Sequence, residues 1–313
     1  MKRRTFYPDI LNHCYQQSAD GGVIFYTLSD HLVYFTNYCI LARKYNVRVL
    51  ALCQMPDHVH DSVSARHLED LVKFKRELNG CFTKAYREYT HTEGPVFKTP
   101  FGSSPKKGAK SARTNLIYVG NNPVERQLVT KAEDYRWNYL AYFLNPHPFS
   151  EPIVIRRASK ALRTAIRAVR SQFQSGYPMN YVLLKNLTKD LNAVEIQQFT
   201  DYVISTYNVI DYLETIRYFD NFADMIISIH ANTGSEYDLN EIFIGKTDKP
   251  YAQMTWILMQ EAGFQDIHEM LSMPLEDKQE LFRILRKRTN VMDAQIAKFL
   301  HLPLKRVIDK QRR

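Results

Sequence analysis

The hydrophobic pattern of the first 65 residues alternates between strand and helix periodicity. Residues 22–27 (GVIFYT) form a short β-rich run, and Ser29 or Asp30 can cap the amphipathic helical pattern that follows. Residues 47–53 (VRVLALC) have the composition of a buried strand, and residues 58–65 (HVHDSVSA) that of a second strand after a tight turn. The pattern therefore predicts a strand, a helix and a hairpin-like pair of strands.

The next segment is mainly helical but contains one long polar interruption. Apolar residues keep a helical spacing over residues 68–89, which predicts a long helix on one face of an α+β sandwich. Residues 94–110 are rich in Gly, Pro, Ser and Lys, which predicts a loop. Helical spacing returns at 111–120 and 132–143, with a break expected at 121–123 because the residue before a proline disfavours the helical conformation.

The stretch Asn145-Pro146-His147-Pro148 is the best candidate linker, because two prolines in four residues cannot continue a helix. It divides the chain into an α+β domain at residues 1–146 and an all-α C-terminal region at residues 150–313. Helical patterns in the second part lie near residues 157–174, 193–205, 209–216, 220–232, 251–262, 276–288 and 292–312.

The last of these patterns have the spacing of a helix-turn-helix over residues 276–312. Pro303 would stand in the first turn of the recognition helix, and three basic residues would lie along that helix as DNA contacts: Lys305, Arg306 and Lys310. A small basic helical subdomain that packs on its neighbour explains the same pattern.

Composition places the chain among ordinary folded proteins. Its 313 residues are enough for two domains that each bury a core, and 45% of them are hydrophobic and 24% charged. We find no apolar run long enough to span a bilayer and no signal-peptide core, so we expect a cytoplasmic protein. The four cysteines have no CxxC spacing, which indicates buried thiols.

The formal net charge of +9 favours a polyanionic partner such as a nucleic acid, because basic side chains set against phosphates release condensed counterions. Many basic proteins bind no nucleic acid, so the chemistry of a site has to decide.

Two histidines in the second predicted hairpin strand are the first candidates for such chemistry. Side chains alternate between the faces of a strand, so His58 and His60 point to the same side and can converge on one cation. An H-x-H pair by itself is more often two unrelated histidines. Here the pair directly follows a buried strand and a tight turn, a position from which both imidazoles can reach a cleft.

Two sequence blocks resemble those of a known family. Residues 51–60 (ALCQMPDHVH) look like the HUH motif of single-tyrosine transposases, especially the REP-associated tyrosine transposases, which commonly read MPNHVH. Residues 118–124 (YVGNNPV), followed by 133–137 (EDYRW), resemble the YxxxNPV and D-Y-x-W blocks of the same family. The blocks occur in the family's order and at about its spacing, and the resemblance covers roughly residues 8–145.

The resemblance implies a ferredoxin-like HUH domain in which His58, His60 and Asn122 hold Mg²⁺ or Mn²⁺ and Tyr118 attacks a phosphodiester of single-stranded DNA. Tyr118 and Asn122 share a helix face, as residues four apart do, although Asn122 precedes a proline and would lie at the frayed end of that helix. The implied substrate contains a DNA hairpin. Related enzymes act as monomers or as homodimers that exchange the tyrosine helix.

Asp61 departs from the family pattern, which has apolar residues after the second histidine. It shares the face of Val59, which we expect to be buried, and a buried carboxylate is costly unless it is paired. Either Asp61 finds a cation, or the strand ends early and the site is degraded. Two alternatives to a strand transferase therefore remain: a catalytically retired DNA-binding regulator, and a metal-dependent hydrolase that forms no covalent intermediate.

Basic residues precede the predicted tyrosine helix and are expected to contact DNA phosphates: Lys106, Lys107, Lys110 and Arg113. A weaker candidate cluster lies on the long helix: Lys73, Lys75 and Arg76.

Overall fold

The fold is α+β, with a four-stranded antiparallel sheet followed by an all-α region. A computed structural model describes residues 5–231, 245 and 247–303. The strands are β1 (Asn12–Gln17), β2 (Arg48–Gln54), β3 (His58–Ser64) and β4 (Gly102–Pro105), in the order β2-β3-β1-β4. With α1 (Leu28–Lys44) and α2 (Leu68–Thr90) the chain runs β-α-β-β-α-β, which is the ferredoxin-like topology.

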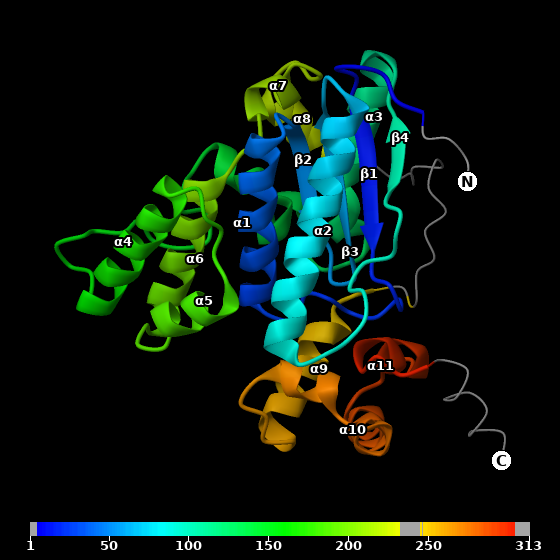
Figure 1. Ribbon diagram of the computed structural model, residues 1–313, viewed down its shortest axis with the longest axis vertical. Coiled ribbons are helices and arrows are strands. Elements are labelled where there is room, and N and C mark those ends of the chain that lie inside the picture. Colours follow the sequence, from blue (N-terminus) through cyan, green and yellow to red (C-terminus); the bar gives the residue numbers. More distant parts are fainter. Residues whose placement is uncertain (1–4, 232–244, 246, 304–313) are drawn as a thin grey trace.

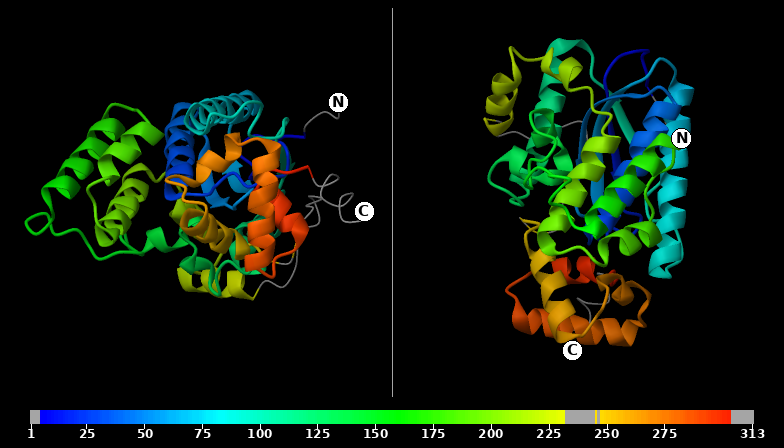
Figure 2. Two further views of the ribbon diagram at one scale, coloured as in Figure 1. Left: turned by 90° about the horizontal axis from the view of Figure 1, so that it is seen from below. Right: turned by 90° about the vertical axis from the view of Figure 1, so that its left-hand side faces the viewer.

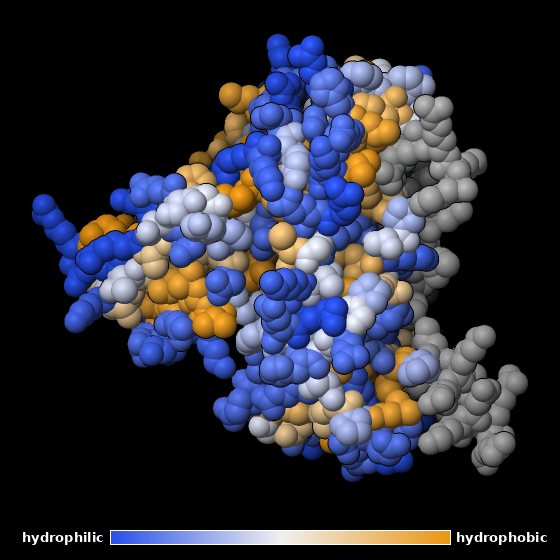
Figure 3. Space-filling view, in the orientation of Figure 1, coloured by the Kyte–Doolittle hydropathy of each residue, from blue (hydrophilic) through white to orange (hydrophobic). Residues whose placement is uncertain are grey.

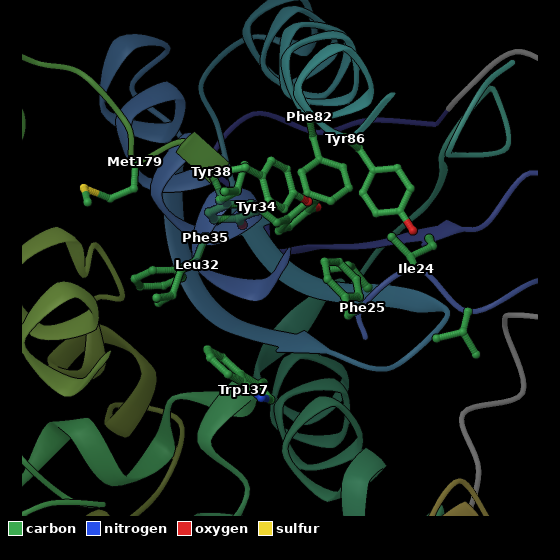
Figure 4. Packing of buried hydrophobic residues seen from close by; sticks show 14 of the residues in the cluster. Ile24, Phe25, Leu32, Tyr34, Phe35, Tyr38, Phe82, Tyr86, Trp137 and Met179 are labelled. Carbon is green, nitrogen blue, oxygen red and sulfur yellow. The ribbon is translucent and has the colours of Figure 1, made fainter. Parts of the chain in front are cut away.

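Helices α1 and α2 cover one face of the sheet (Figure 1). Their aromatic side chains fill the space between the layers, as Figure 4 shows for Tyr34, Tyr38 and Phe82, and they pack on the sheet residues of this face. Helix α1 begins at a capping box, in which the Thr27 hydroxyl accepts from the Asp30 N–H and the Asp30 carboxylate accepts from the Thr27 N–H. The predicted caps, Ser29 or Asp30, thus lie within the first turn of the helix, two and three residues after the true cap.

Helix α3 (Gly108–Glu125) covers the opposite face of the sheet and runs through Pro123. The break predicted at 121–123 is wrong: the Arg126 N–H donates to the Asn122 carbonyl at 3.0 Å, a normal helical bond. A proline this near the end of a helix removes one hydrogen bond, and the buried side of the last turn packs against the sheet. The helix predicted at 132–143 is instead three short 3₁₀ turns at Ala132–Asp134, Arg136–Asn138 and Leu140–Phe143.

The strand predicted at 22–27 is also wrong. This run is irregular, with the N–H groups of Ile24 and Phe25 both donating to the Pro56 carbonyl, and its apolar side chains enter the core. The first strand is β1, which has only two apolar residues in six, and β4 lies in the predicted loop of 94–110. Neither strand has hydrophobic alternation, so periodicity could not find them.

The helical region forms three groups of helices. Helices α4 (Lys160–Gln174), α5 (Tyr181–Thr188) and α6 (Ala193–Tyr207) lie beside α1, and α7 (Tyr212–Ile216) and α8 (Phe222–His230) lie beside β2 and α3 (Figures 1 and 2). The third group lies beyond the ends of the strands, at the bottom of Figure 1, and contains α9 (Pro250–Glu261), a 3₁₀ helix (Ile267–Ser272), α10 (Leu275–Arg288) and α11 (Asp293–Phe299). One hydrophobic core joins residues on both sides of the predicted boundary at 146–150. The division into two domains stays a prediction.

Helices α10 and α11 contact each other across a short turn, as the helix-turn-helix prediction requires of its first two helices. The predicted third helix, with Lys305, Arg306 and Lys310, falls outside the described residues, and the motif stays a prediction.

The surface that carries α1 and α2 is largely hydrophilic, while hydrophobic side chains gather over α4, α5 and α6 (Figure 3). Within the part of the chain that the structure describes, every helix is too short or too polar to cross a membrane.

Candidate active site

The two predicted histidines lie on the face of the sheet that α3 covers. His58 begins β3 and His60 stands two residues on, so the strand's alternation turns both rings toward α3, with the ring centroids 4.9 Å apart. Both side chains are buried. Burial, together with the neighbouring His58 and His13, lowers the pKa of His60 well below its usual value, so this imidazole is neutral at neutral pH.

Tyr118 reaches the same place from α3. Its ring lies edge-on to that of His60, with the centroids 5.4 Å apart, and its side chain is 4% exposed. Cys53 in β2 and Met55, which directly follows that strand, pack against Tyr118 from the side of the sheet. The structure thus brings the predicted nucleophile and the predicted histidines together within one chain.

Asn122 lies one helical turn beyond Tyr118, on the same face of α3, so their Cβ atoms are about 6 Å apart. Its side chain is 1% exposed, and neither atom of its amide has a hydrogen-bond partner among residues 5–231, 245 and 247–303. A buried amide without partners is costly, and such groups are uncommon in proteins unless a ligand or water satisfies them.

Two aromatic residues of β1 belong to this cluster and were missed in the sequence. His13 Nε2 lies 3.0 Å from His60 Nδ1, and the His13 ring centroid is 5.6 Å from that of Tyr118. Tyr15 is directly opposite His60 in the sheet, with ring centroids 4.9 Å apart. The period-two spacing His13-x-Tyr15 is the signal that could have found them, but it has meaning only once β1 is known to be a strand.

Asp57, in the turn before β3, holds the ring of His58. Its Oδ1 lies 2.7 Å from His58 Nδ1, and its Oδ2 lies 2.5 Å from the ammonium group of Lys298 in α11. Burial alone would raise the pKa of Asp57, but the neighbouring His58 and Lys298 hold it below its usual value. The carboxylate therefore stays ionised, and His58 would use Nε2 to bind a ligand.

The side chains of His58, His60 and Asn122 have nitrogen and oxygen atoms of the kinds that bind divalent metal ions. Among the described residues, no group of three or more His, Cys, Asp or Glu side chains is placed to hold a metal ion. The predicted ligands are instead two imidazoles and the buried Asn122 amide. A carboxylate orients the His58 ring, as is usual for histidines that bind metals. His58, His60 and Asn122 stay predicted ligands.

Asp61 finds a cation, which is the first of the two outcomes expected from the sequence. Its Oδ2 lies 2.5 Å from Lys75 Nζ and accepts from the Tyr38 hydroxyl at 2.7 Å, with all three groups buried between β3, α1 and α2. Strand β3 continues past it to Ser64. Asp61 is thus no sign of a degraded strand, and Lys75 lies in the core, where it cannot contact a phosphate.

The basic residues before Tyr118 have three different environments. Lys107 and Lys110 are exposed, with the ammonium group of Lys107 over the Tyr7 ring, and their contact with DNA stays a prediction. Lys106 is only 2% exposed, so it can contact a phosphate only if its surroundings move, and its DNA contact stays a prediction. Arg113 contacts α8 through Asp224 at 3.2 Å and Ser228 at 2.8 Å, which makes it a link between helices.

We compared the chain with known proteins. No protein-family profile and no curated protein sequence matches it. Among solved structures, it is similar to a REP-associated tyrosine transposase bound to a REP hairpin, with 17% identity and a TM-score of 0.39 over 44% of this chain and 80% of that one. A likeness at this level shows neither the family nor the activity of this chain.

Proposed function

We propose that this chain processes DNA as transposases do, cleaving and rejoining single strands with Tyr118 as the nucleophile. The observation that supports this most is the buried contact between a phenol from α3 and the imidazole of His60, whose ring lies beside that of His58. The sequence blocks that carry the family resemblance supply these same residues.

In this proposal His58, His60 and Asn122 hold the divalent ion, Mg²⁺ or Mn²⁺. The ion would polarise the scissile phosphate and stabilise the negative charge on its oxygens. Asp57 keeps the His58 ring in one orientation, and the low pKa of His60 keeps its imidazole neutral, the form that binds metals.

The covalent step exchanges one phosphodiester for another. The Tyr118 oxygen bonds to phosphorus as the bond from phosphorus to the 3′ oxygen breaks, which leaves a 5′-phosphotyrosine and a free 3′-OH. The phenol loses its proton and the departing 3′ oxygen gains one, so protons balance. We assign this proton transfer to His13, whose ring lies beside that of Tyr118. Because the bond energy is conserved, a second 3′-OH can reverse the step without ATP.

Burial of the site favours one competing function. With Tyr118 and Asn122 almost fully covered, a DNA strand reaches the phenol only if α3 or its surroundings move. A protein that binds DNA without cleaving it, as a retired transposase would, needs no such motion. A homodimer is not required to bring Tyr118 to His60, and whether one forms stays a prediction.

A covalent-adduct assay separates these functions. The protein is incubated with end-labelled single-stranded DNA hairpins and Mn²⁺ and resolved under denaturing conditions. We expect an adduct that is absent in Tyr118→Phe and present in Tyr15→Phe, the control for a second phenol beside His60. Hairpin binding without an adduct in the wild type indicates the regulator. Multiple turnovers that persist in Tyr118→Phe indicate a hydrolase with water as the nucleophile.

A further inference from the structure

The helices at the bottom of Figure 1, beyond the ends of the strands, contact the candidate site through a buried ion pair. We call residues 248–303 the C-terminal helical unit; it contains α9, α10 and α11. Lys298, in α11, places its ammonium group 2.5 Å from Asp57 Oδ2, and both side chains are buried. The other oxygen of the same carboxylate lies 2.7 Å from His58 Nδ1. One carboxylate therefore connects the unit to a predicted metal ligand.

Several contacts hold the end of α11 and the residues that follow it against the segment of residues 18–26. The Tyr26 hydroxyl donates to the Phe299 carbonyl at 2.6 Å, and the His301 imidazole contacts Asp20 at 2.5 Å and the Val23 carbonyl at 2.8 Å. A Cβ atom on Gly22 would lie only 2.3 Å from the His301 ring, so this close approach requires glycine.

The chain segment between these contacts also holds the turn itself. The Ser18 N–H donates to the Asp57 carbonyl, and the Ile24 and Phe25 N–H groups donate to the Pro56 carbonyl. The segment of residues 18–26 therefore contacts both the end of α11 and the turn before His58. The backbone of Asp57 and the end of the helix that carries Lys298 are held by the same segment.

The unit also contacts the end of the tyrosine helix. Arg126, directly after α3, binds Asp248 through Nη2 at 2.8 Å and Nε at 3.1 Å. The Asp248 N–H in turn donates to the Arg126 carbonyl. The unit therefore contacts both elements of the site, the histidine strand through Asp57 and the tyrosine helix through Arg126.

We infer that Lys298 is a positioning residue, which fixes the Asp57 carboxylate so that the His58 ring keeps its Nδ1–H toward Asp57 and its Nε2 toward the metal position. The C-terminal helical unit thereby sets the metal affinity of a site that lies outside it. This inference rests on the proposed function for the identity of the ligand, but the orientation of His58 is a property of the metal-free protein.

The test measures His58 in two ways. Imidazole ¹⁵N NMR of the metal-free protein reports the His58 tautomer, and Mn²⁺ titration followed by electron paramagnetic resonance reports affinity. In Lys298→Met we expect a mixture of His58 tautomers and about tenfold weaker Mn²⁺ binding, the lower end of the range for outer-shell partners of metal ligands. Lys298→Arg keeps a cation there and should restore most of both readouts.

Two further variants guard against a general loss of structure. Lys278→Met removes another buried lysine of the same unit, one that bonds the Leu271 carbonyl, and should change neither readout. The double variant Asp57→Asn/Lys298→Met leaves no lone buried charge, so it should fold and still bind Mn²⁺ about tenfold more weakly.

A folded Lys298→Met protein and a folded double variant with the wild-type tautomer and affinity would overturn the inference. If the wild type binds no Mn²⁺, the proposed function fails instead. The tautomer measurement then decides the role of Lys298 by itself.

Discussion

The ring of Tyr118 lies edge-on to the imidazole of His60, with an interplanar angle of 84°. The contact joins α3 to β3 in the middle of a buried layer, where water is largely excluded and electrostatic interactions are strong. A polar side chain in this layer that has no hydrogen-bond partner lowers the stability of the fold. Such a side chain indicates that it is kept for function and not for folding.

Asn122 is such a group, because its buried amide has no partner among the residues that the structure describes. We expect Asn122→Leu to raise the free energy of unfolding by about 1–3 kcal/mol, since it removes the desolvation penalty of the amide. The same variant should lose Mn²⁺ affinity and adduct formation. Urea unfolding and Mn²⁺ titration measure the two effects.

Asn290→Leu is the control, because it changes an exposed asparagine outside the site and should move neither quantity by much. A less stable Asn122→Leu protein with unchanged Mn²⁺ binding would show that the amide serves the fold and not a ligand.

The Asp61–Lys75 pair should be essential for stability. Lys75→Met leaves a buried carboxylate without its cation, which costs about 3–5 kcal/mol, whereas Asp61→Leu/Lys75→Met removes both charges and recovers most of that loss. The control is Lys73→Met on the same helix, whose exposed pair with Glu69 is worth at most about 1 kcal/mol. Equal effects of Lys75→Met and Lys73→Met on urea unfolding would contradict the pairing.

His268 should make stability depend on pH. Burial opposes its charge, but Asp30 and Asp266 raise the pKa of His268 from 6.5 to about 10. The folded state thus binds more protons than the unfolded chain between these values, and stability falls as pH rises from 6.5 to about 10. On the acid side, the lowered pKa values of Asp30 and Asp266 mean that stability falls as pH drops below about 3.8.

Thermal unfolding across this pH range checks the prediction. His268→Gln should remove the alkaline slope between pH 6.5 and about 10, while His67→Gln, at an exposed position, should keep it. An unchanged slope in His268→Gln would assign the pH dependence to other groups.

Two basic residues near the start of α3 should behave differently toward DNA. Lys110→Ala is expected to weaken DNA binding and to reduce the salt dependence of log K by about one, because an exposed phosphate contact is lost. Arg113→Ala should instead lower the free energy of unfolding by about 1 kcal/mol, since it removes the bonds to α8 and the stacking on Phe219. Equal loss of DNA affinity in both variants would contradict this distinction.

Local pattern was enough to predict much of the framework. The long helix near residues 68–89, the antiparallel pair β2 and β3 and most of the C-terminal helices follow from apolar periodicity, which reports the buried face of each element. The common face of His58 and His60 follows from the period-two alternation of a strand, which is a property of the backbone.

Contacts between distant segments were decided only by the tertiary structure. Strand β1 is polar by composition and becomes a strand because it pairs with β3 and β4, which brings His13 and Tyr15 into the site. Lys75 and Lys298 are ordinary basic residues in sequence, yet both are buried on carboxylates from other elements. The pairing of a buried charge depends on what the whole fold places opposite it, and no local periodicity encodes that partner.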